Sequence, residues 1–168
     1  MIASCVSDIL VPIDFGPSSE VALGYAKGLA VSFDASLHLL HVVDDVNIGD
    51  RSAVDSSKRP AAAGEACVSD EGTRLCNFLS RDEVIRFHAT SALVFGSTVA
   101  SITKYARQQG IDLIVMGTNR CTPVSGNVVG SIAESVGRAA HCPVVTVRNS
   151  GAVEVLYSDR ARPAAAEA

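Results

Sequence analysis

The feature that most constrains the fold of this chain is a short apolar run at residues 9–13 that has no polar face. A strand with one solvated face alternates apolar and polar side chains, whereas a strand buried on both faces is apolar throughout. Residues 112–116 indicate a second buried strand. Together the two runs predict a parallel sheet that is covered on both faces.

Further strands are predicted at residues 37–43, 87–94 and 143–147, and helices at residues 65–79, 97–109 and 131–141. Ser97 is the expected cap of the helix at 97–109, and Gly110 its C-terminal stop. The first helix should follow a turn at residues 14–18 and run to Phe33. Its apolar face has helical spacing and comprises Ala22, Tyr25, Ala26, Leu29, Ala30 and Phe33. Strands and helices that alternate in this way, joined by right-handed crossovers, predict an α/β fold with an open five-stranded parallel sheet and helices on both faces.

Composition sets the class of protein and its organisation. The chain has 168 residues, a formal net charge of −4 and no basic run, which argues against nucleic-acid binding. It has no apolar stretch of the roughly 20 residues that cross a membrane, and no signal-peptide pattern, so we expect a cytoplasmic protein. The length fits one domain at residues 1–148, with a variable loop at 44–66 and a flexible tail at 149–168. The five cysteines are odd in number and lack C-x-x-C spacing, which predicts free thiols.

The most site-like segment runs from Gly117, after a buried strand, to Gly130 and Ser131, where a helix opens. In parallel sheets, ligands bind beyond the carboxyl ends of the strands. Glycines allow the backbone to come close to a ligand, and a helix N-terminus offers free N–H groups to a phosphate. The alternative is that these glycines only form turns and that Ser131 caps the helix.

A carboxylate, Asp14, ends the first strand. If the first and fourth strands are neighbours, Asp14 and Gly117 flank one crevice. Asp14 could then hold a ribose hydroxyl, or a Mg²⁺ that is bound to phosphates. The alternative is an Asx turn that leads into the first helix.

Motifs of most nucleotide enzymes are missing from the sequence. No lysine lies in a G-K-[ST] context, and the first strand-to-helix turn lacks G-x-G-x-x-G. His38 and His41 lie three apart on one strand, hence on opposite faces, where they cannot chelate a metal together. No nucleophile has a recognisable base nearby, so no catalytic residue is predicted, and activity would be at most a slow ATPase.

Residues 9–15, 37–43, 112–118 and 130–147 resemble the universal stress protein family, in the same order along residues 6–148. The resemblance implies a UspA-like domain with a Rossmann-like fold and strand order 3-2-1-4-5. It also implies a role in the stress response and a homodimer that pairs through the last strand, from Pro143 to Arg148. A regulatory protein partner would fit the same role.

Members of this family that bind ATP carry the motif G-x2-G-x9-G-[ST]. Gly117, Gly130 and Ser131 match it, but Arg120 stands at the middle glycine and Pro123 at a position that is usually small. Arg120 could bind phosphate through charge-assisted hydrogen bonds, or its stem could fill the space that the phosphates need. The positions that surround adenine and ribose in such relatives are intact. The predicted nucleotide site therefore comprises Pro12, Ile13, Asp14, Val42, Met116, Gly117, Arg120, Gly130, Ser131 and Ile132.

Two functions follow from this resemblance. The first is a regulator that binds ATP or AMP, with Mg²⁺ as a possible companion. The second is a dimeric protein-interaction module without nucleotide or cofactor, which the substitution at Arg120 favours.

Overall fold

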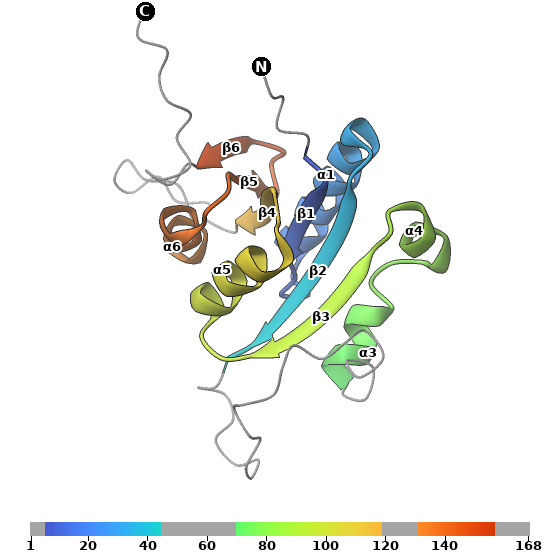
Figure 1. Ribbon diagram of the computed structural model, residues 1–168, viewed down its shortest axis with the longest axis horizontal. Helices are drawn as coiled ribbons and strands as arrows, with labels where there is room; N and C mark the ends of the chain where they lie inside the picture. The colour runs from blue at the N-terminus through green and yellow to red at the C-terminus, as the bar shows by residue number, and fades with distance from the viewer. Residues whose placement is uncertain (1–5, 45–69, 119–130, 157–168) are drawn as a thin grey trace, which may run out of the picture.

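The computed structural model describes residues 6–44, 70–118 and 131–156 (Figure 1), and strands alternate with helices along them. None of the helices in these ranges is long and apolar enough to cross a membrane. The elements in chain order are β1 (Asp8–Pro12), α1 (Pro17–Phe33), β2 (Ser36–Val43), α3 (Asp70–Cys76), α4 (Arg81–Arg86), β3 (Thr90–Phe95), α5 (Thr98–Gln109), β4 (Leu113–Thr118), α6 (Ser131–Ala139), β5 (Val144–Arg148) and β6 (Val153–Leu156).

The strands form one sheet in the order β3-β2-β1-β4-β5-β6. Strands β1 to β5 are parallel, so the predicted order 3-2-1-4-5 is confirmed. Ile9 of β1 lies in register with Leu37 of β2 on one side and with Leu113 of β4 on the other. The chain therefore leaves β1 in one direction and returns on its other flank at β4, which makes a topological switch point between these strands.

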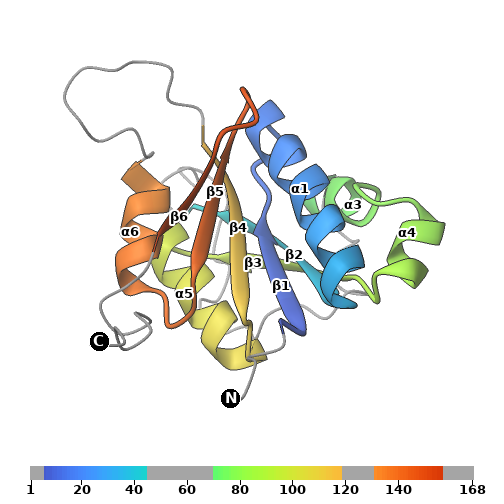
Figure 2. The same ribbon diagram turned by 90° about the horizontal axis from the view of Figure 1, so that it is seen from above.

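A helix layer covers each face of the sheet (Figure 2), with α1, α3 and α4 on one side and α5 and α6 on the other. Ile9, Leu10 and Val11 of β1 are fully buried, as the apolar run predicted. Ile9 and Val11 pack on the α1 side, whereas Leu10 packs on the side of α5 and α6. Full burial of such side chains contributes roughly 1.5–3 kcal/mol each, so the central strand anchors both cores.

The sheet has a sixth strand that the sequence analysis missed. Residues 149–168 were predicted as a flexible tail, but Val153–Leu156 pair antiparallel with β5 after a turn in which Gly151 has φ +80°. Leu156 packs against α6, where its side chain lies 3.0 Å from the position of a Cβ on Gly137. The sheet is therefore mixed at this edge. The predicted dimer edge, Pro143 to Arg148, is not free, because β6 already pairs with Val144–Val147.

The segment before β3 also differs from prediction. The strand expected at 87–94 begins only at Thr90, because Phe87 closes α4. Helix α4 starts with a capping box in which the Ser80 hydroxyl accepts from the Glu83 N–H and the Glu83 carboxylate accepts from the Ser80 N–H. This S-x-x-E pattern is typical of a helix start and explains why α4 begins here. The described part of the helix predicted at 65–79 is α3, Asp70–Cys76.

Helix ends and faces refine the remaining predictions. Helix α1 ends at Phe33 as predicted but begins at Pro17, inside the turn expected at residues 14–18. Tyr25 and Phe33 are 38% and 45% exposed, so these two are wrongly placed in its core-facing stripe. Gly110 ends α5 in a left-handed conformation, as predicted, whereas the Ser97 side chain makes no capping hydrogen bond. Helix α6 ends at Ala139, two residues before the predicted end.

The cysteines differ in state. Cys142 is a free thiol, buried at the start of β5. Cys76 is disulfide-bonded, and the predictions for Cys5, Cys67 and Cys121 lie outside the described residues. The prediction that all five cysteines are free thiols is therefore wrong at Cys76.

Candidate functional site

A cavity of about 430 Å³ opens at the carboxyl ends of β1, β2 and β4, at the switch point of the sheet. Eight of the ten residues predicted to bind nucleotide line it, and they come from four separate stretches of the chain. These eight are Pro12, Ile13, Asp14, Val42, Met116, Gly117, Ser131 and Ile132. The other two, Arg120 and Gly130, lie outside the described residues, as does Pro123.

The sequence analysis missed the other half of the cavity lining. These residues lie at helix starts or on inward faces of strands and helices, where no motif marks them. They are Ser18, Ser19, Leu40, His41, Thr98, Ile102, Thr118 and Ala133. One available signal was positional, because the first turn of a helix that follows a parallel strand lies at the ligand-binding edge.

Asp14 makes an Asx turn and also faces the cavity. Its Oδ1 accepts a hydrogen bond of 2.8 Å from the Gly16 N–H, as the structural alternative for this residue predicted. Asp14 is exposed and makes no other hydrogen bond with the described residues, so Oδ2 keeps its acceptor capacity. The turn fixes the carboxylate at the mouth of the cavity without occupying it.

Gly117 has a packing role that differs from the predicted one. A Cβ at this position would lie 2.1 Å from the Ser18 carbonyl oxygen and 2.8 Å from the Ser18 Cβ. The missing side chain thus allows the first turn of α1 to press against the end of β4. The same contact brings two serines of α1, Ser18 and Ser19, to the cavity wall.

The loop between β1 and α1 is held from the β2 side. Phe15 has a left-handed φ of +60°, which is unusual for a bulky residue. Its ring lies 4.5 Å from the ring of His41, and the Arg74 guanidinium lies 4.2 Å above it. His41 Nδ1 donates to the Ile13 carbonyl oxygen at 2.6 Å. These contacts stabilise a strained backbone next to the cavity, which is where such strain is often found.

Charge at the site comes from the backbone more than from side chains. The first residues of α1, α5 and α6 line the cavity, and helix N-termini present unpaired N–H groups and positive dipole ends. No side chain caps α1 or α5. Among the described residues that line the cavity there is no lysine or arginine, and Asp14 is the acidic one. The arrangement suits a ligand that combines an apolar body with hydrogen-bonding and anionic groups.

The two histidines of β2 lie on opposite faces, as their spacing predicted. His41 lines the cavity, whereas His38 lies across the sheet, with Nδ1 3.1 Å from the Tyr105 hydroxyl and Nε2 3.3 Å from Asp8 Oδ1. No group of three metal-ligating side chains exists among residues 6–44, 70–118 and 131–156. The described part of the cavity lining therefore offers apolar and hydrogen-bonding groups and no such metal-ligating cluster.

Comparison with known sequences agrees with this geometry. Residues 6–148 match the model of the Universal stress protein family. A universal stress protein of Methanocaldococcus jannaschii is 28% identical over 152 residues, which cover 83% of this chain and 93% of that protein. A putative universal stress protein of Staphylococcus epidermidis is 29% identical over 157 residues, covering 93% of this chain and 92% of the relative.

Solved structures show the same fold. The universal stress protein UspA from Lactobacillus plantarum superposes with a TM-score of 0.60 at 26% identity, over 86% of this chain and 99% of that one. A universal stress protein in complex with cAMP gives a TM-score of 0.57 at 21% identity, over 86% and 98% of the two chains. The second likeness concerns the fold alone.

Proposed function

Because the chain belongs to the universal stress protein family, we propose that it is a stress-response protein that binds an adenine nucleotide, ATP or AMP, in the cavity at the carboxyl ends of β1 and β4. One observation carries the proposal: eight residues selected from the sequence for this role line a single cavity at the switch point of the sheet. Its volume of about 430 Å³ falls within the roughly 300–1,000 Å³ typical of small-molecule sites.

The lining suggests how the nucleotide lies. The base would pack against the apolar side chains of Val42, Ile102 and Met116, which come from both sides of the switch point. Asp14 would accept from ribose hydroxyls, or hold Mg²⁺ bound to the phosphates, through the oxygen that the Asx turn leaves available. The phosphates would meet the N-terminus of α6 at Ser131 and Ile132. A relative of the same fold has been solved with cAMP, which contains the same base and sugar.

Calorimetry with ATP, ADP and AMP tests the proposal. We expect micromolar binding by the wild-type protein and about a tenfold loss in Asp14→Asn, because the amide oxygen keeps the turn to Gly16 while the charge is removed. Asp34→Asn is the matched control, since Asp34 lies at the opposite end of α1 and its left-handed backbone suits asparagine. Absence of binding at millimolar nucleotide would overturn the proposal, and the interaction module would then be favoured.

The interaction module has its own supporting observation at β6. Val153 and Val155 alternate along this edge strand and are 41% and 44% exposed. We propose that a second copy of the chain pairs with this edge, in place of the β5 edge predicted from the sequence. Val155→Lys should then convert a dimer to a monomer in light scattering, whereas Val31→Lys, on the exposed surface of α1, should not. A wild-type monomer at 100 μM would overturn pairing at β6.

A further inference from the structure

Ser18 carries an unexplained polar group at the wall of the cavity. The residue is 4% exposed, and its Oγ is the one buried side-chain nitrogen or oxygen within the described ranges that has no hydrogen-bond partner. Buried hydroxyls are nearly always partnered, because an unmade hydrogen bond costs stability. The exception therefore calls for a physical reason at this position.

The neighbouring residue shows that the local backbone can satisfy a serine. Ser19 is also buried and also lines the cavity, yet its Oγ donates to the Gly16 carbonyl oxygen at 2.9 Å. Ser18 lies one position earlier, where its backbone packs against Gly117 at the end of β4. The two serines lie in the same helix, are both buried and both line the cavity. They differ in that the fold supplies a hydrogen-bond partner for the Ser19 hydroxyl and none for the Ser18 hydroxyl.

The surroundings of Ser18 restrict the ligand group that would meet it. Ser18 lies in the first turn of α1, four residues after Asp14, and both residues line the cavity, where Asp14 keeps one carboxylate oxygen available. Without a bridging cation, a phosphate next to this carboxylate would be repelled, and no lysine or arginine lines the described part of the cavity to offset the repulsion. A sugar hydroxyl, in contrast, can donate to the carboxylate and accept from a serine at the same time.

We propose that the Ser18 hydroxyl hydrogen-bonds the ribose of the bound nucleotide, sharing it with Asp14. This inference rests on the nucleotide function proposed above and assigns a further contact in the same cavity. In the structure the Oγ is not accessible, so binding requires rotation of the Ser18 side chain about χ1 into the cavity. A serine has three staggered positions about this bond, and the rotation breaks no hydrogen bond, since the Oγ has none.

The experiment compares Ser18→Ala with Ser19→Ala in calorimetry and thermal unfolding. Ser18→Ala should bind ATP about fivefold more weakly, the size of one net hydrogen bond. Its ligand-free melting temperature should equal or exceed that of the wild type, because the variant removes an unpartnered hydroxyl. Ser19→Ala should instead lower the ligand-free melting temperature, because it removes the 2.9 Å hydrogen bond to the Gly16 carbonyl oxygen.

Ribose analogues identify the group that Ser18 contacts. One of the two analogues, 2′-deoxy-ATP or 3′-deoxy-ATP, lacks the hydroxyl that Ser18 contacts. Wild type and Ser18→Ala should bind that analogue with equal affinity. Equal losses for ATP and both deoxy analogues would overturn the ribose contact, as would wild-type affinity for ATP in Ser18→Ala. A ligand-free Ser18→Ala protein that is destabilised or fails to fold would also overturn it, by showing a structural role. If wild type itself binds no nucleotide, the proposed function fails first and this contact fails with it.

Discussion

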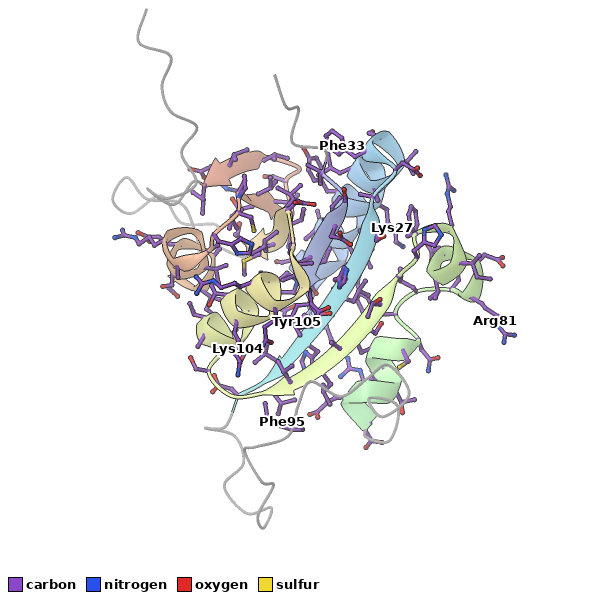
Figure 3. All side chains as sticks on the ribbon, viewed as in Figure 1. Lys27, Phe33, Arg81, Phe95, Lys104 and Tyr105 are labelled. Carbon is purple, nitrogen blue, oxygen red and sulfur yellow. The ribbon has the colours of Figure 1, made fainter. Side chains whose placement is uncertain are left out.

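The two ends of the parallel sheet treat their polar groups in opposite ways. At the amino end, Tyr105 of α5 faces β2 (Figure 3) and completes a chain of hydrogen bonds through His38 to Asp8. Asp112 accepts from the backbone N–H groups of Ser7 and Asp8 at 2.9 and 3.2 Å. At the carboxyl end, Ser18 has no partner and Asp14 retains a free oxygen. The polar groups named at the amino end thus satisfy one another, whereas Ser18 and Asp14 at the carboxyl end keep unused hydrogen-bonding capacity.

The raised pKa values of two buried groups at the amino end also indicate that this end is not reactive. Burial raises the pKa of the Tyr105 hydroxyl to about 12. Burial, together with the Asp112 carboxylate, raises the pKa of the Cys142 thiol to about 11. Both groups stay protonated at neutral pH, so they are poor nucleophiles and acids. Titratable groups that gather at one edge of a sheet therefore do not mark a site when they satisfy one another.

The largest effect is expected at the carboxyl end, from Gly117→Ala. The new Cβ would lie 2.1 Å from the Ser18 carbonyl oxygen, so α1 and β4 must separate. We expect a loss of about 3 kcal/mol in the free energy of unfolding, at the upper end for overpacking, measured by urea denaturation. Nucleotide affinity should fall as well, because the same shift opens the cavity.

Gly28→Ala is the matched control for this substitution. Gly28 lies in α1 with no atom within 4 Å of an added Cβ, so alanine should stabilise the helix by about 0.5–1 kcal/mol. If Gly117→Ala were as stable as wild type, the close packing of α1 on β4 would be wrong. The explanation that Gly117 allows Ser18 and Ser19 to reach the cavity wall would then also be wrong.

A smaller effect is expected at the amino end, from Tyr105→Phe. The substitution removes the hydroxyl and leaves His38 Nδ1 without its 3.1 Å partner in a partly buried position. We expect a loss of about 1 kcal/mol in unfolding free energy and no change in nucleotide affinity. Tyr105→Phe should thus lower stability without changing affinity, whereas Ser18→Ala should lower affinity without lowering stability. A change of affinity in Tyr105→Phe would break the division between the two ends.

The sequence predicted the five parallel strands because buried strands and amphipathic helices leave local patterns. Strand β6 left no such local pattern, because Val153–Leu156 is short and its pairing depends on β5 being an open edge. Cavity residues such as Asp14 and Gly117 were found because they lie at the carboxyl ends of strands. Ser18 and Thr98 were missed because their placement depends on how closely helices approach the sheet, which Gly117 controls for Ser18. Tertiary distance, unlike periodicity, cannot be derived from a single sequence.

The smallest effect is expected from the ion pair that anchors α4 near the amino end of β2. Lys27, which lies between α1 and α4 in Figure 3, contacts Glu83 with its Nζ 2.6 Å from Oε1. The hydrogen bond from Lys27, followed by those from Ser80, lowers the pKa of Glu83 from 4.5 to about 2. The ionised form is therefore favoured in the folded state. Its contribution is complete above pH 4.5 and is lost as the pH falls from 4.5 towards 2.

Glu83→Gln should accordingly be less stable than wild type at pH 7, by about 0.5–1 kcal/mol, because both groups are partly exposed and solvent screens the pair. The gap between the two unfolding curves should close as the pH drops through this window, since the wild-type carboxyl then becomes neutral. Asp82→Asn, one residue earlier in α4, is the control and should keep the wild-type acid sensitivity. A gap that persists unchanged at pH 2 would show that Glu83 acts through shape and capping, which the glutamine alters, and not through its charge. In that case side-chain shape and capping would hold α4 in place, and the division between the two ends of the sheet would rest on the bonds of Tyr105, His38 and Asp8.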